Sequence, residues 1–60
     1  MTKRAREMMY TVRDRTFEIT PDDEPLFFYA VAKEMGLRDD EADDIDTELT
    51  TQIMRAKGAI

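Results

Sequence analysis

The chain contains one long apolar run, residues 26–32 (LFFYAVA), in a sequence that is otherwise crowded with charge. The run holds two of the three Phe residues, whereas 38% of the chain is Asp, Glu, Lys or Arg. A helix that spans a bilayer needs about 20 apolar residues, so this run is far too short to cross a membrane. We therefore expect residues 26–32 to form the centre of a folded domain that does not contact a membrane.

The chain length limits how much of that domain can be buried. Sixty residues form one small domain, covering 1–60, and a domain of this size buries only about 60% of the surface that its unfolded chain exposes. There is no Cys and no His, which excludes disulfides and the usual zinc or iron ligand sets. We therefore expect the core to be supplemented by another protein chain, either a second copy in a homodimer or a larger or basic protein.

Residues 1–20 fit two structures. Ala5, Met8, Met9 and Val12 recur at the spacing of an amphipathic helix, which Thr2 would cap. Residues 16–20 (TFEIT) alternate polar and apolar side chains and are rich in β-branched and aromatic types, which favours a strand. We favour a strand or β-hairpin over residues 8–20, with one apolar face made of Tyr10, Val12, Phe17 and Ile19.

Residues 20–25 (TPDDEP) are typical of a helix entrance, because Pro fits the first turn and acidic side chains favour the positive end of the helix dipole. With Asp22 or Asp23 as the cap, Pro25 stays in the first turn, so the pattern predicts a helix over residues 23–35. Gly36 is then expected to end this helix in the left-handed conformation. Its apolar face would be unusually wide: Phe27, Phe28, Val31, Ala32 and Met35, with Tyr29 widening it further.

A face of this width needs cover from more than one side. The rest of the chain supplies few apolar residues for that purpose. We therefore predict that Leu26, Phe27 and Tyr29, together with Met54 on the next helix, contact another protein chain.

A second helix is predicted over residues 40–57, antiparallel to the first. One narrow apolar stripe runs through it at spacings of three and four, as in a helix that lies on a neighbour: Ala42, Ile45, Leu49, Ile53 and Ala56. Asp39 or Asp40 would cap its start and Gly58 would end it. The predicted fold class is mainly α, a small α+β domain in which an N-terminal strand or hairpin packs on two antiparallel helices, expected to be dimeric.

Residues 39–48 hold seven acidic side chains. They do not form a calcium loop of the EF-hand type, which needs Gly at its sixth position and Glu at its twelfth; counted from Asp39, those positions are Asp44 and Thr50. A solvated helix face explains the row well. The alternative is a surface that binds a basic partner, made of Asp39, Asp40, Asp43, Asp44 and Asp46.

No catalytic, metal or cofactor site is predicted, because the chain has no Ser, His or Cys and no Gly-rich phosphate loop. We expect a small acidic protein that is not an enzyme: a regulatory or inhibitory module that binds another protein, or an accessory subunit of a larger enzyme complex. The basic residues 1–6 are not followed by an apolar segment, so no signal peptide is predicted and a cytoplasmic location is expected.

A DNA-binding function is the remaining alternative. A strand at residues 16–20, a helix ending at Gly36 and a second helix resemble a ribbon-helix-helix repressor or antitoxin over residues 15–56. The resemblance implies a dimer whose paired strands enter the major groove, with Arg13 and Arg15 as candidate phosphate contacts. The sequence departs from the pattern at Glu18, which would face DNA phosphates, and a net charge of -5 disfavours nucleic-acid binding in general.

Overall fold

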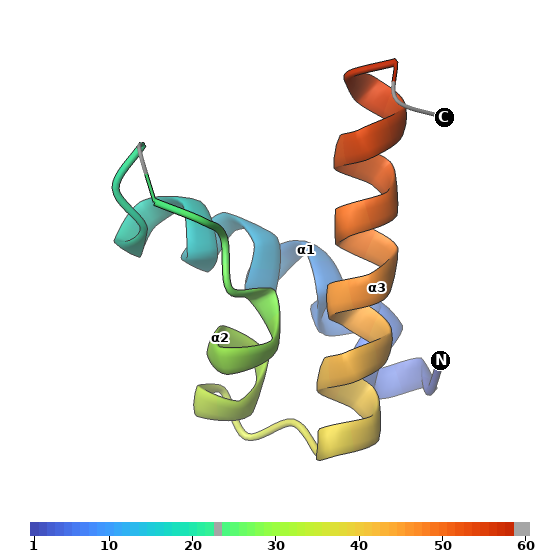
Figure 1. Ribbon diagram of the computed structural model, residues 1–60. Coiled ribbons are helices and arrows are strands. Elements are labelled where there is room, and N and C mark those ends of the chain that lie inside the picture. Colours follow the sequence, from blue (N-terminus) through green and yellow to red (C-terminus); the bar gives the residue numbers. More distant parts are fainter. Residues whose placement is uncertain (23, 59–60) are drawn as a thin grey trace.

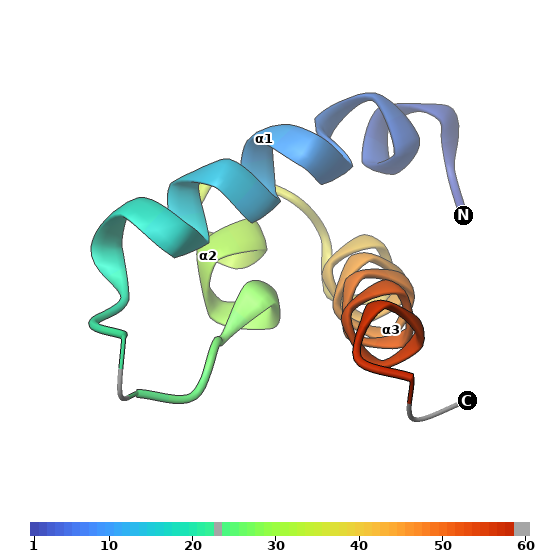
Figure 2. The same ribbon diagram turned by 90° about the horizontal axis from the view of Figure 1, so that it is seen from above.

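The computed structural model describes residues 1–22 and 24–58, which form three helices and no strand. The helices are α1 (Lys3–Ile19), α2 (Phe28–Glu34) and α3 (Asp39–Ala56). α2 and α3 lie side by side and run in opposite directions (Figure 1), and α1 crosses over both of them (Figure 2). The predicted α+β fold, with a strand or hairpin on two helices, is therefore wrong; the domain is a helical bundle.

Residues 8–20, predicted as a strand or hairpin, belong almost entirely to α1. The Thr2 hydroxyl caps this helix by accepting a hydrogen bond from the N–H of Ala5 at 3.1 Å. The buried face is Ala5, Met9, Val12 and Thr16, which continues the helical stripe that was the alternative for residues 1–12. Burial of this stripe against α2 and α3 outweighs the local β propensity.

The exposed side chains of α1 confirm that no β face exists at residues 8–20. Of the four residues expected on that face, only Val12 is buried, whereas Tyr10, Phe17 and Ile19 are 49%, 49% and 47% exposed. Thr16, expected on the polar side, is completely buried. Its hydroxyl donates to the carbonyl of Val12 at 2.7 Å, which satisfies the hydroxyl within the helix.

The ribbon-helix-helix resemblance loses the element on which it depended. Residues 16–19, which would have formed the DNA-reading strand, are the last turn of α1. Within residues 1–22 and 24–58 no other segment is extended into a strand.

α2 is much shorter than the predicted helix over residues 23–35. Asp23 lies outside the described residues, and residues 24–27 are not helical. Pro25 disfavours the α conformation at Glu24, whose N–H instead donates to the carbonyl of Pro21 at 3.0 Å and closes a turn. The linker between α1 and α2 therefore occupies the segment that was expected to begin the helix.

The predicted end of α2 at Gly36 is confirmed. Gly36 has a φ of 93°, its N–H donates to Lys33, and the N–H of Leu37 donates to Ala32 at 3.1 Å. This pair of bonds is the Schellman motif, and Leu37 is buried, which provides the apolar contact that often accompanies the motif.

α3 agrees with its prediction to within one residue at each end. Its first helical residue is Asp39, so Arg38 and not Asp39 or Asp40 occupies the cap position. The carboxylate of Glu41 accepts the N–H of Arg38 at 3.1 Å, which is one half of a capping box. Gly58, with a φ of 77°, follows the last turn as expected.

The core lies between the three helices. It comprises these buried apolar residues: Ala5, Met9, Val12, Phe28, Val31, Ala32, Leu37, Ala42, Ile45 and Leu49. Phe27, predicted on the apolar face of its helix, is 61% exposed. The α3 stripe is buried only as far as Leu49, after which Ile53 is half-buried and Ala56 is exposed. The C-terminal turns of α3 extend past α1 and α2 (Figure 1).

Candidate protein-binding groove

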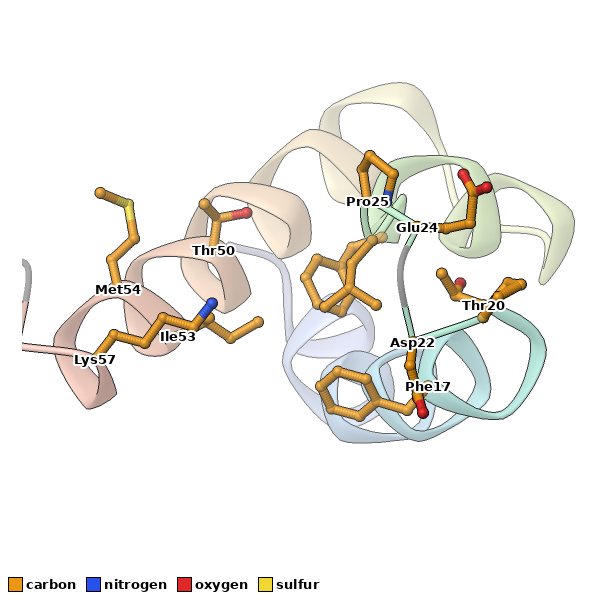
Figure 3. A pocket seen from close by; sticks show the side chains of 12 residues that line it. Phe17, Thr20, Asp22, Glu24, Pro25, Thr50, Ile53, Met54 and Lys57 are labelled. Atoms are coloured by element: carbon orange, nitrogen blue, oxygen red, sulfur yellow. The ribbon is translucent and has the colours of Figure 1, made fainter.

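An open groove of about 660 Å³ separates the last turns of α3 from the end of α1 and the linker that follows it (Figure 3). The groove exists because α3 continues beyond the point where the other two helices cover it. It is lined by Phe17, Thr20, Pro21, Asp22, Glu24, Pro25, Leu26, Phe28, Thr50, Ile53, Met54 and Lys57. We call this feature the α3 groove.

The linker wall of the α3 groove is shaped by its two prolines. Pro21 and Pro25 each fix their own φ and cannot donate a backbone hydrogen bond. The turn between them places Leu26 at the edge of the core, where it is half-buried. This arrangement leaves Leu26 facing both the core and the groove.

The aromatic wall is held by contact between two helices. The rings of Phe17 and Phe28 pack edge to face, with centroids 6.2 Å apart and planes at 82°. Phe28 is buried, whereas Phe17 is half exposed. Phe17 therefore presents a fixed apolar surface to the groove.

The α3 wall carries Thr50, Ile53, Met54 and Lys57, which share one face of the helix because they stand at i, i+3, i+4 and i+7. Lys57 lies on this wall, whereas Asp22 and Glu24 lie across the groove on the linker. Apolar side chains with charged groups at their edges are the general anatomy of a protein interface.

Two shallower hollows adjoin the α3 groove. One, of about 350 Å³, shares Phe17 and Ile53 with it and continues between α1 and α3 past Arg13. The other, of about 380 Å³, lies on the far side of the linker and contains Phe27 and Ile19. The three hollows together include four exposed large apolar side chains: Phe17, Ile19, Phe27 and Met54.

The predicted partner-binding residues are only partly brought together. Leu26 and Met54 line the α3 groove, whereas Phe27 faces the hollow beyond the linker. Tyr29 is separate from both, and its hydroxyl donates to Asp39 Oδ1 at 3.0 Å. Two groove residues were not predicted as partner contacts. Phe17 was assigned to a strand, and Ile53 was assigned to the apolar stripe of the helix predicted over residues 40–57.

Arg13 and Arg15, the candidate phosphate contacts, pair with neighbours on α1. The Arg13 guanidinium lies over the Tyr10 ring at 4.8 Å from its centroid and bonds to Asp14 at 3.0 Å. Arg15 lies 3.8 Å from Glu18. Both arginines therefore have carboxylates beside them on their own helix.

Four of the five residues of the predicted acidic surface on α3 are exposed, and their surroundings differ. Asp39 lies 2.5 Å from the ammonium of Lys33, which together with the Tyr29 hydroxyl lowers the pKa of its carboxyl. Asp40 lies 3.7 Å from Arg38, and Asp44 lies 3.7 Å from the terminal amine. Asp43 is exposed and Asp46 is half-buried.

Glu41 belongs to the same acidic row but is buried, with 4% of its side chain exposed. Its carboxylate accepts hydrogen bonds from the Arg4 guanidinium, the Thr2 hydroxyl at 2.7 Å and the backbone N–H of Arg38. These bonds, that from Arg4 foremost, lower the pKa of Glu41 to about 2. Because Thr2 also caps α1, Glu41 joins the N-termini of two helices.

Glu41 was not predicted as a distinct residue of the acidic row. The capping-box spacing, Glu three residues after the cap position, was the available sign. Within residues 1–22 and 24–58, no three acidic side chains converge as a metal site would require. In the same residues no helix is long and apolar enough to cross a membrane.

Comparison with protein-family models, with curated protein sequences and with solved structures found no match to this chain.

Proposed function

We propose that this chain is a non-catalytic regulatory or inhibitory module that binds another protein through the α3 groove. The observation that carries the proposal is the convergence of partly exposed apolar side chains from three separate elements on one open hollow: Phe17 from α1, Leu26 from the linker, and Ile53 and Met54 from α3. Contiguous exposed apolar surface on a small protein commonly marks an interaction site.

The groove is open to solvent rather than enclosed, which suits a protein segment better than a buried small molecule. The opposed charges, with Asp22 and Glu24 on one side and Lys57 on the other, would orient such a segment. Charged groups at an interface edge contribute more to orientation and association rate than to affinity.

The exposed carboxylates of α3 support a second role, in steering a basic partner towards the chain. Asp40, Asp43 and Asp44 are exposed on the N-terminal half of the helix, away from the α3 groove. Their effect would be long-ranged and screened by salt. Replacing Asp43, Asp44 and Asp46 by Asn should slow association at low salt and flatten its salt dependence while leaving the groove intact.

Site-specific photocrosslinking tests the groove as a binding surface. A photoreactive amino acid is placed at position 54 in the cells that produce the protein naturally, and crosslinked products are identified by mass spectrometry. We expect one defined protein adduct at position 54. The matched position is Glu7, which is exposed on α1 and lines none of the three hollows, and it should give no such adduct.

Purified components then test whether the groove carries the affinity. Phe17→Ser should weaken binding of the identified protein, whereas Tyr10→Ser should not, although both side chains are aromatic and 49% exposed on the same helix. Equal crosslinking at positions 54 and 7, or equal binding by the two Ser variants, would contradict the proposal.

A further inference from the structure

The C-terminal half of α3 carries an apolar face that the rest of the described chain covers only in part. Ile53 is half-buried and Met54 is 43% exposed. Ile53 continues the stripe whose earlier members, Ile45 and Leu49, are at most 1% exposed, and Met54 lies beside that stripe. A helix that buries its stripe for half its length and exposes it for the rest favours a partner at the exposed end.

The shape of the α3 groove restricts what could fill it. An occupant with an apolar face fits the groove, because Phe17, Leu26 and Met54 line it. The C-terminal half of α3 itself has that form. A two-fold axis that placed this segment of one copy in the groove of another would place the second copy's segment in the first groove as well.

The charges of the two surfaces are complementary. Residues 49–58 contain Arg55 and Lys57 and no acidic residue, whereas the linker wall of the groove carries Asp22 and Glu24. The acidic residues of α3 occupy its other half, residues 39–48, at the far end of the helix (Figure 1). The net charge of -5 is thus concentrated away from the groove, so two copies could meet there without opposing their acidic clusters.

We propose that the occupant of the α3 groove is a second copy of this chain. In the resulting two-fold dimer, the C-terminal half of α3 of each copy lies in the groove of the other, with its Lys57 beside Asp22 and Glu24. The proposal rests on the groove being a protein-binding surface, as proposed above, and it names the partner. It also supplies the apolar cover that a 60-residue domain needs.

Sedimentation equilibrium over a wide range of protein concentration tests the dimer directly. The natural chain should change from its monomer mass of 7.0 kDa to twice that mass as concentration rises. Met54→Gln should weaken dimerisation by about tenfold or more, since burial of a Met side chain contributes on that order. Tyr10→Ser, outside the groove, should leave the dimer constant unchanged, and circular dichroism should show that both variants remain folded.

Charge reversal tests the arrangement within the dimer. We expect two variants to dimerise more weakly than the natural chain: the single variant Lys57→Glu, and the double variant Asp22→Lys with Glu24→Lys. Each variant, studied by itself, forms a symmetric dimer that contains two repulsive contacts. An equimolar mixture should regain dimerisation, because in the mixed dimer both contacts pair opposite charges. A merely unfolded or generally weakened variant would not be rescued in this way.

The remaining outcomes separate the two proposals. A natural chain that stays monomeric at all concentrations, or a dimer that is unaffected by Met54→Gln and by both reversals, would overturn the second-copy proposal. If crosslinking at position 54 then identified a different protein, the groove would still be a binding surface. The absence of both self-association and crosslinking would overturn both proposals.

Discussion

Arg4 on α1 and Glu41 on α3 are joined by two hydrogen bonds between one guanidinium and one carboxylate. The two residues are 37 positions apart, so this contact closes the N-terminal end of the bundle. Planar, two-point pairing of this kind is specific to arginine and fixes orientation as well as distance. The third partner, Thr2, extends the same network to the cap of α1.

The Glu41 network predicts how stability depends on acid. The folded-state pKa of Glu41, about 2, lies below the ordinary value of 4.5. Its contribution to stability is therefore complete above pH 4.5 and is lost as pH falls towards 2. Glu41→Gln should reduce the free energy of unfolding at neutral pH. It should also make that free energy fall less steeply as pH decreases from 4.5 towards 2. Urea unfolding at a series of pH values, followed by circular dichroism, measures both effects.

Two further variants make the Glu41 test specific. Arg4→Met removes the strongest cause of the lowered pKa and should likewise flatten the acid decline. Glu7→Gln removes a carboxylate that is 65% exposed and only 4.0 Å from Lys3, a pairing that contributes little, and should leave stability nearly unchanged. An acid decline as steep in Glu41→Gln as in the natural chain would show that the network does not control it.

Thr16 tests whether the end of α1 is a packed helix. Thr16→Val keeps the buried volume and removes a hydroxyl that bonds within its own helix, so the free energy of unfolding should change by less than about 1 kcal/mol. Thr16→Ser deletes the buried methyl group instead and should destabilise by about 1 kcal/mol. On the polar face of an exposed strand, both changes would be nearly neutral, so a larger loss for Ser than for Val distinguishes the two structures in denaturant unfolding.

The contrast between α1 and α3 shows what the sequence could and could not predict. α3 was predicted to within a residue because its stripe, its charges and Gly58 all indicate the same helix. In α1, Thr16, Phe17 and Ile19 have β propensity, and only their burial against other helices decides between strand and helix. That information is tertiary and is not contained in a local pattern.

The same limit applies to the candidate site. Leu26 and Met54 were predicted as partner contacts because they lay outside the expected apolar stripes. The groove that unites them depends on how far α3 extends past α1 and on the path of the linker between Pro21 and Pro25. Phe17 could be recognised as a groove residue only once α1 was known to be helical there.

Gly36 predicts a measurable backbone effect. Its φ of 93° is disfavoured for residues with a Cβ, but an added Cβ would meet nothing within 4 Å. Gly36→Ala should therefore lower the free energy of unfolding by about 1–2 kcal/mol through backbone strain alone. Gly36→Asn should cost less, since Asn tolerates this conformation. Equal unfolding midpoints for Ala and Gly at this position would contradict the predicted strain.

Tyr29 and Asp39 provide a final prediction, which spectroscopy can follow directly. The Tyr29 hydroxyl donates to the Asp39 carboxylate, and this bond raises the pKa of Tyr29 above its ordinary 10.0. Because the folded-state pKa is raised, the bond stabilises the fold below pH 10.0, and its contribution is lost as pH rises through the folded-state pKa. Asp39→Asn should lower the Tyr29 pKa towards its ordinary value.

The measurement is an ultraviolet titration of tyrosinate formation in a Tyr10→Phe background, where Tyr29 is the only tyrosine left. Lys33→Met distinguishes the effect of the Lys33 charge on Tyr29 from that of the Asp39 carboxylate. The Lys33 charge lowers the Tyr29 pKa. This variant should therefore move the titration to higher pH, opposite to the shift from Asp39→Asn. Shifts of the same sign in both variants would mean that the hydroxyl does not titrate against the Asp39 carboxylate.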